Sequence, residues 1–228
     1  MHDELRRRVL EANQAIVDAG LVTLTFGNVS GVDRAAGVMA IKPSGVAYEQ
    51  LDANAIVIVD LETGKPAGGS LRPSSDAPTH LVLYRRFAGA GGVVHTHSPF
   101  ATAWAQAGRD LPCLGTTHAD HFHGAVPVTR ALSAAEIGGD YEVETGNVIV
   151  EAASDPHGVP AALVCGHGPF VWGADVEEAV ENAVALEAVA ALAFRTLAIE
   201  PQTGELDAPL RDRHFARKHG ASRYYGQP

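Results

Sequence analysis

The chain has 228 residues, of which 46% are hydrophobic, and a formal net charge of −10 at pH 7. This length and composition suffice for one globular domain, which we expect to span residues 1–228. The acidic balance excludes a typical nucleic-acid-binding surface, and two cysteines exclude a disulfide framework. No uninterrupted apolar run is as long as a membrane span, and the first residues lack the apolar core of a signal peptide. We therefore expect a cytoplasmic protein without a membrane partner.

The predicted elements alternate between helices and strands along the chain. Apolar residues recur at helical spacing up to Gly20, which predicts an amphipathic helix over the first twenty residues. Short apolar runs between turn-forming residues predict strands at 21–26, 38–41 and 56–59. The connections between these early strands are only turn-length, too short for parallel crossovers throughout.

Helix starts are marked by cap-type residues. Ser74-Ser75-Asp76-Ala77-Pro78 predicts a helix that continues to residue 87, and Ser98-Pro99 predicts another that ends at Gly108. Asp175 and Glu178 have capping-box spacing at the head of a helix running to about Thr196. The pattern favours an α/β fold, with a mostly antiparallel or mixed central sheet and helices on both faces.

Three histidines lie where predicted strands end. His95 and His97 alternate at the end of an apolar run, so on a strand their imidazoles would share one face. His167 follows the apolar run 161–165 and could complete the trio from a neighbouring strand. A His-x-His pair alone is also common on exposed strands that bind nothing. The Gly, Ser and Pro residues beside both segments favour a catalytic metal site with one open position.

Two further residues near the trio could ligate the same ion. Cys165 precedes His167 by two residues and could share its face, the alternative being a small core residue. Asp76 could be a fourth ligand or hold a metal-bound water. The alternative is an acidic first-turn residue that the helix dipole favours.

Three loops carry groups suited to one anion, namely Gly27-Asn28, Lys42-Pro43-Ser44-Gly45 and Ser74-Ser75. Glycine permits close backbone approach, a helix start exposes N–H groups, and Lys42 adds a positive charge. Such donors suit a phosphate monoester. Each loop taken singly is equally an ordinary turn or cap.

The run from Thr116 to His123 concentrates titratable groups without a regular pattern. His118, His121 and His123 could be additional metal ligands. Polar loops of this kind also hold acid and base groups, which makes Asp120 a candidate for proton transfer.

Taken together, these motifs resemble the class II aldolase/epimerase superfamily, also called the aldolase II and adducin head superfamily. Within it they are most similar to the L-ribulose-5-phosphate 4-epimerases. The matching stretches occur in family order over nearly the whole chain, at 27–30, 41–46, 72–80, 93–98, 114–120, 166–170, 217–220 and 224–227.

The resemblance implies roles for individual residues. One divalent ion per subunit, usually Zn²⁺, would be held by the trio with Asp76 nearby. The substrate phosphate would be held by Asn28, Lys42, Ser44, Gly45, Ser74 and Ser75. The implied acid/base pair is Asp120 and Tyr225, assisted by His214 and Thr116.

The resemblance also implies an assembly. Subunits would form a homotetramer, a fourfold ring in which the C-terminal tail, about residues 205–228, completes the neighbouring site and donates Tyr225. The only implied small-molecule partner is a sugar phosphate.

The implied reaction inverts C4 of a pentulose 5-phosphate, L-ribulose 5-phosphate giving D-xylulose 5-phosphate, by retro-aldol cleavage and re-addition through an enediolate. L-xylulose 5-phosphate is an alternative substrate. The nearest rival is an aldolase of the fuculose-1-phosphate type, for which the resemblance leads us to expect a threonine-type phosphate loop and glutamate in place of Asp76. A third alternative is a non-enzymatic adducin-head-like domain, against which the intact trio weighs. His121 and His123 replace tyrosines found in some relatives.

Overall fold

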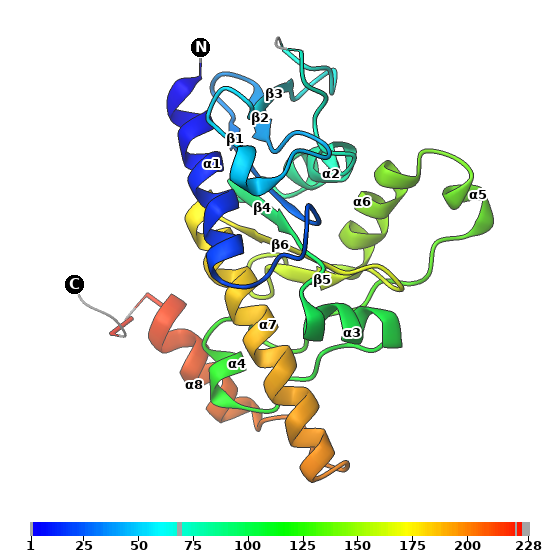
Figure 1. The fold of residues 1–228 in the computed structure, drawn as a ribbon. Coiled ribbons are helices and arrows are strands. Elements are labelled where there is room, and N and C mark those ends of the chain that lie inside the picture. Colours follow the sequence, from blue (N-terminus) through cyan, green and yellow to red (C-terminus); the bar gives the residue numbers. More distant parts are fainter. Residues whose placement is uncertain (1, 68–69, 222, 225–228) are drawn as a thin grey trace.

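A six-stranded antiparallel sheet forms the centre of the fold (Figure 1). The structure is a computed structural model that describes residues 2–67, 70–221 and 223–224. The sheet order is β3-β2-β1-β4-β6-β5, and every neighbouring pair is antiparallel. The strands are β1 Asn28–Asp33, β2 Val38–Ile41, β3 Val57–Asp60, β4 Gly92–His95, β5 Ala161–Leu163 and β6 Pro169–Gly173. This confirms the predicted α/β architecture.

Eight α-helices surround the sheet in the described ranges. They are α1 Asp3–Asp18, α2 Ala77–Arg86, α3 Pro99–Ala107, α4 Thr116–Ala119, α5 Ala134–Ile137, α6 Tyr141–Ala152, α7 Val176–Ile199 and α8 Ala208–His219. A short 3-10 turn, η1, covers Tyr48–Gln50. Helices α1 and α7 pack on one face of the sheet, and α2 with α6 covers the other (Figure 1).

Strand alternation divides the core into two layers. On β2, Val38 and Ala40 join the cluster under α1 and α7, whereas Met39 and Ile41 join the cluster under α2. This alternation follows from the two-residue period of a strand, which sends successive side chains to opposite faces. Both faces of the sheet are therefore buried, and function has to lie at its ends and loops.

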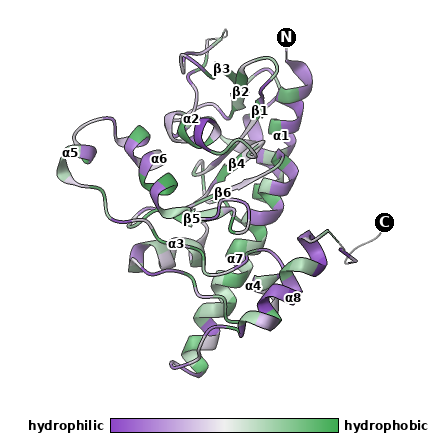
Figure 2. Ribbon diagram, turned by 180° about the vertical axis from the view of Figure 1, so that it is seen from behind, coloured by the Kyte–Doolittle hydropathy of each residue, from purple (hydrophilic) through white to green (hydrophobic). Residues whose placement is uncertain are grey.

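Helix α7 extends past the sheet, and α4 and α8 pack together beside that extension (Figure 1). Figure 2 shows that α7 is largely hydrophobic and α8 largely hydrophilic. On length and composition alone α7 could cross a membrane, which is weak evidence for a span. Its first half buries Val176, Ala183 and Leu186 in the core, as expected for a core helix.

One predicted strand is wrong. Residues 21–26 form a turn rather than a strand, because Leu24 and Gly27 have left-handed φ values of 57° and 83° that interrupt an extended backbone. The predicted strand at 161–165 is two residues too long, since β5 ends at Leu163. The long helix α7 continues three residues past the expected Thr196. Its cap differs as well: the Asp175 carboxylate accepts from the Glu178 amide, but Glu178 accepts from Ala174 rather than from Asp175.

Candidate metal centre and anion pocket

His95 lies at the end of β4 with its ring almost fully buried. Its Nδ1 is 2.9 Å from the carbonyl oxygen of Pro169, which can only accept, so Nδ1 carries the proton. Phe170 stacks on the imidazole at 4.2 Å between centroids. Burial lowers the pKa of His95 to about 3, which keeps the ring neutral. His95 therefore presents Nε2 as a free lone pair in a fixed orientation, as metal-ligating histidines do.

His97 and His167 bring two more imidazoles to this point. His97 follows β4 rather than lying on it, and its Nε2 is 3.1 Å from Nε2 of His95. His167 comes from the turn between β5 and β6, and its buried Nδ1 has no hydrogen-bond partner among the described residues. Ligand nitrogens of the three residues lie within 4.8 Å of one another.

The donor set fits a divalent ion such as Zn²⁺. Three imidazoles converge, one has its tautomer fixed by a carbonyl, and another has a buried nitrogen without a partner among the described residues. Three histidine ligands leave a fourth position for a water or substrate oxygen. The family resemblance predicted the same three residues.

Asp76 and Cys165 are not part of this group of ligand atoms. Asp76 instead accepts a hydrogen bond from Nδ2 of Asn28 at 2.7 Å. Burial would raise the pKa of Asp76, but His95, His80 and the Asn28 amide together hold it below its usual value. Asp76 is thus an ionised carboxylate beside the trio, in a position to hold a water or a substrate hydroxyl.

The three predicted anion loops converge. Backbone bonds join two of them directly, because the Ser44 amide donates to Arg72 and the Ser74 amide donates to Lys42. Together with the trio they line one pocket of about 290 Å³. Its lining residues are Thr25, Phe26, Gly27, Asn28, Lys42, Pro43, Ser44, Gly45, Ser74, Ser75, Asp76, His95, His97 and His167.

Lys42 is the cation of this pocket. Its side chain is buried, its Nζ donates to the Val46 carbonyl at 2.8 Å, and it lies over the Tyr48 ring at 4.7 Å. Burial lowers the pKa of Lys42. An ammonium held by one carbonyl and an aromatic face keeps donor capacity for an anion.

Tyr84, Ser30 and His80 form a chain of buried, hydrogen-bonded side chains behind the pocket, which was not predicted from the sequence. Ser30 on β1 lies 2.7 Å from Nδ1 of His80 and 2.8 Å from the Tyr84 hydroxyl, both on α2. His80 is fully buried, and its Nε2 has no partner among the described residues. A signal was present, because Asn28 and Ser30 share one face of a strand while Asp76, His80 and Tyr84 share one face of a helix.

Gly27 also has a role that its sequence motif did not specify. A Cβ there would lie 2.8 Å from the His95 carbonyl oxygen, so only glycine permits this approach.

The candidate acid/base residues form a separate cluster. Asp120 follows α4 and accepts hydrogen bonds from His214 and Arg217 of α8. Thr116 opens α4, and its carbonyl accepts from the Asp120 amide. None of these residues is in the lining of the pocket. Tyr225 lies outside the described residues.

The three histidines near Asp120 have other partners. His118 is buried and donates from Nε2 to the Gly124 carbonyl at 2.7 Å, and His121 lies against the ammonium of Lys218. His123 contacts the Asp212 carboxylate at 2.9 Å. None of them joins the described group of ligand atoms.

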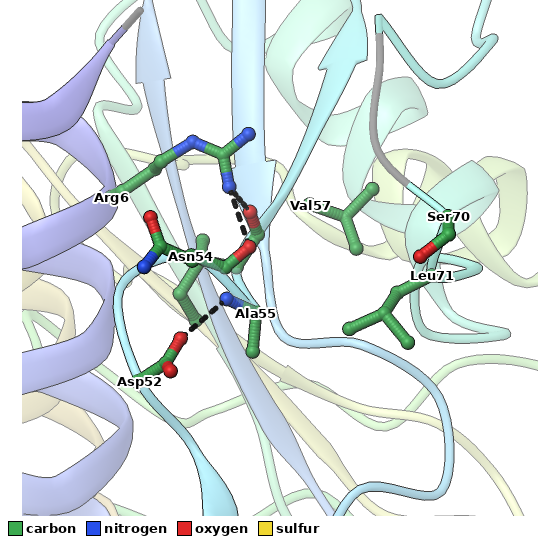
Figure 3. A pocket seen from close by; sticks show the side chains of 8 residues that line it. Arg6, Asp52, Asn54, Ala55, Val57, Ser70 and Leu71 are labelled. Atoms are coloured by element: carbon green, nitrogen blue, oxygen red, sulfur yellow. Dashed lines mark hydrogen bonds between the residues drawn. The ribbon is translucent and has the colours of Figure 1, made fainter.

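A second pocket, of about 380 Å³, lies between α1 and the loop after η1 (Figure 3). The Arg6 guanidinium at its wall points to backbone carbonyls, including those of Asn54 and Ile56. Since the Arg6 guanidinium is occupied by the protein's own carbonyls, this pocket offers less to an anionic ligand than the first.

Comparison with known proteins places these features in a family. The family described as Class II Aldolase and Adducin N-terminal domain matches residues 7–194. Among solved structures, an L-fuculose 1-phosphate aldolase aligns with a TM-score of 0.80 at 21% identity, covering 94% of this chain and 95% of the other. YgbL from Escherichia coli aligns with a TM-score of 0.73 at 24% identity, covering 94% and 99%. The L-fuculose-1-phosphate aldolase from Thermus thermophilus gives 0.67 at 24%, covering 89% and 98%.

Proposed function

The chain belongs to the class II aldolase and adducin N-terminal domain family, and from that premise we propose that it is a metal-dependent enzyme acting on a sugar phosphate. The proposed reaction is epimerisation at C4 of a pentulose 5-phosphate by reversible cleavage of the C3–C4 bond. The observation that carries the proposal is the convergence of the histidine trio and the Lys42 loop around one pocket.

The pocket supplies the two functions that this reaction needs. When bound by the trio, a divalent ion supplies a Lewis acid that stabilises negative charge on the fragment left by cleavage. Lys42, Ser44 and Ser75 supply the other requirement, a site for the phosphate of the second fragment. A fragment held by its phosphate can rotate its aldehyde group, so that the opposite face is presented when the C3–C4 bond forms again. This inverts the configuration at C4.

Proton transfer at the C4 oxygen is needed once on each face of the aldehyde, for which we propose Asp120 and Tyr225. Because Asp120 is outside the pocket lining of its own chain, the proposal includes a homo-oligomer, a tetramer, in which a neighbouring subunit supplies this chemistry. Co-refolding inactive His97→Asn chains with inactive Tyr225→Phe chains should restore part of the activity. Hetero-oligomers without any recovered activity would contradict shared sites.

A second candidate is an aldolase of the fuculose-1-phosphate type, which the similarity to two such structures favours. The two reactions separate in one experiment. Metal-loaded protein is incubated with L-ribulose 5-phosphate and, in parallel, with L-fuculose 1-phosphate, and all products are quantified. We expect D-xylulose 5-phosphate without free fragments, and none from the His97→Asn control. Stoichiometric dihydroxyacetone from the first substrate, or cleavage of the second only, would establish the aldolase. No turnover of either substrate would reject both.

A further inference from the structure

The carboxylate of Asp120 is held from one side by α8. Arg217 forms a fork, with Nε donating to Oδ1 at 2.9 Å and Nη2 donating to Oδ2 at 2.7 Å. His214 adds a bond from Nδ1 to Oδ1 at 3.0 Å. The three side chains are 16–25% exposed, so water competes only partly for these bonds.

The two oxygens of the carboxylate are not equivalent. A carboxylate offers about four acceptor positions, two on each oxygen. Among the described residues, Oδ1 accepts from both Arg217 and His214, which fills it, whereas Oδ2 accepts from Arg217 alone. One acceptor position therefore stays open among the described contacts, and it is on Oδ2.

We propose that Arg217 is a positioning residue for Asp120, orienting the carboxylate so that Oδ2 is the oxygen that exchanges a proton with the substrate, while His214 closes Oδ1. This inference rests on the proposed function, because it assumes that Asp120 is an acid/base group. It adds two details to that function, namely that Arg217 orients Asp120 and that Oδ2 is the oxygen that exchanges the proton.

The surroundings of Asp120 make Arg217 the dominant influence. His219 of α8 donates to the Asp120 backbone carbonyl at 2.9 Å and so anchors the helix rather than the carboxylate. Lys218 pairs with Glu181 of α7 at 2.9 Å and contacts His121. Burial alone would raise the pKa of Asp120, but the bonds from Arg217 and then His214 hold it below its ordinary value.

The test combines an activity-independent readout with kinetics. The Asp120 carboxyl is titrated by carbon NMR, assigned with Asp120→Asn, in wild type, Arg217→Met and Arg217→Lys. Arg211→Met is the matched control, because Arg211 is on the same helix but pairs with Asp212. We expect Arg217→Met to raise the pKa of Asp120 by about one unit or more, and Arg211→Met to leave it unchanged.

The kinetic arm separates charge from orientation. Arg217→Met should move the acid limb of the kcat profile to higher pH, with metal content and KM unchanged. Arg217→Lys keeps the charge but loses the fork, so the acid limb should stay near wild type while kcat falls about tenfold or more. Full kcat in Arg217→Lys would overturn the orienting role.

The inference and the proposed function fail in different ways. An Asp120 pKa unchanged in both Arg217 variants, with α8 still folded onto α4 by NMR, would overturn the inference whatever the activity. Absence of sugar-phosphate turnover by wild type would instead reject the proposed function, and the inference as a catalytic statement with it.

Discussion

The metal pocket and the α4–α8 cluster differ in how their polar groups are satisfied. Around the pocket, Oδ1 of Asn28, Nε2 of His80 and Nδ1 of His167 are buried without a partner among the described residues. In the cluster, the Asp120 carboxylate has three bonds from its own chain. Burying a polar atom without a partner costs roughly 1–3 kcal/mol, so each such atom calls for an explanation, such as a bound ligand, ion or water. The pocket region thus has polar atoms available for a ligand, whereas the bonds in the cluster hold a carboxylate in a fixed orientation.

Loss of one trio histidine should produce the largest loss of metal binding and activity. A small loss would contradict the assignment of the pocket, rather than the α4–α8 cluster, as the metal site. His97→Asn is expected to lower metal affinity by on the order of 10²-fold or more, because two imidazoles remain of three, and activity should fall with it. Elemental analysis after purification without chelator, followed by an activity assay, measures both.

The matched control is His123→Asn, a histidine of the cluster that contacts Asp212 instead. It should keep full metal content. A His97→Asn protein with wild-type metal and activity would show that the trio is not the metal site.

Lys42→Met should produce the next largest effect. The variant keeps the length of the side chain but removes the charge, and a lost charge-assisted hydrogen bond is worth about 1.5–3 kcal/mol. KM for a sugar phosphate should rise roughly 10- to 100-fold, with metal content unchanged. Steady-state kinetics with L-ribulose and its 5-phosphate test this. Equal turnover of the two sugars by wild type would mean that the loop does not bind phosphate.

The two regions also differ in how far sequence could predict them. The elements that carry the trio follow from local patterns, namely apolar runs that end in His, Gly and Pro. The convergence of the Lys42 and Ser74 loops could not be derived locally, because it depends on backbone bonds between segments about thirty residues apart. The family resemblance supplied it. Ser30 and His80 were missed because the face each shares with its neighbours on a strand or a helix does not show which strand packs against which helix.

At residues 21–26 the local pattern was present but predicted the wrong backbone conformation. Its apolar composition predicts a strand, yet Leu24 is 77% exposed in a left-handed conformation. Tertiary context decided the backbone there, since residues 25–27 have to line the pocket beside His97. The arrangement of Asp120 with Arg217 depends on α8, almost a hundred residues later, and no spacing rule reaches so far.

Acidification should weaken both regions through their buried histidines, and two of these, His80 and His118, lie outside the metal-ligand trio. Burial lowers the pKa of His80 behind the pocket to about 4, and that of His118 beneath the cluster to about 4, from an ordinary 6.5. In the unfolded chain these two histidines take up protons below pH 6.5, whereas in the folded chain they do so only near pH 4. Stability is therefore complete above pH 6.5 and is lost as pH falls toward 4, by about 2 kcal/mol per histidine at pH 5.

Urea denaturation of metal-free protein at pH 7 and pH 5 measures this loss. In His80→Gln and in His118→Gln the difference between the two pH values should shrink by about 2 kcal/mol each. A difference that stays as large as in wild type would show that the corresponding histidine is not buried in its neutral form.

Tyr84→Phe should have the smallest effect and would sharpen the description of the pocket. Burial raises the pKa of Tyr84, so its hydroxyl keeps a proton, and Ser30 is the side chain within reach to accept it. Ser30 can then donate to Nδ1 of His80, which leaves the His80 proton on Nε2, the atom without a partner. Removing the hydroxyl should cost about 1 kcal/mol of stability and change kcat less than about twofold, because the hydrogen-bonded chain of Tyr84, Ser30 and His80 lies behind the pocket. Nitrogen NMR of the His80 ring reads the tautomer directly. A proton found on Nδ1 would mean that His80 donates to Ser30, which reverses the donor–acceptor order of the chain. A loss of activity as large as that of Lys42→Met would show that Tyr84 acts directly in the active site.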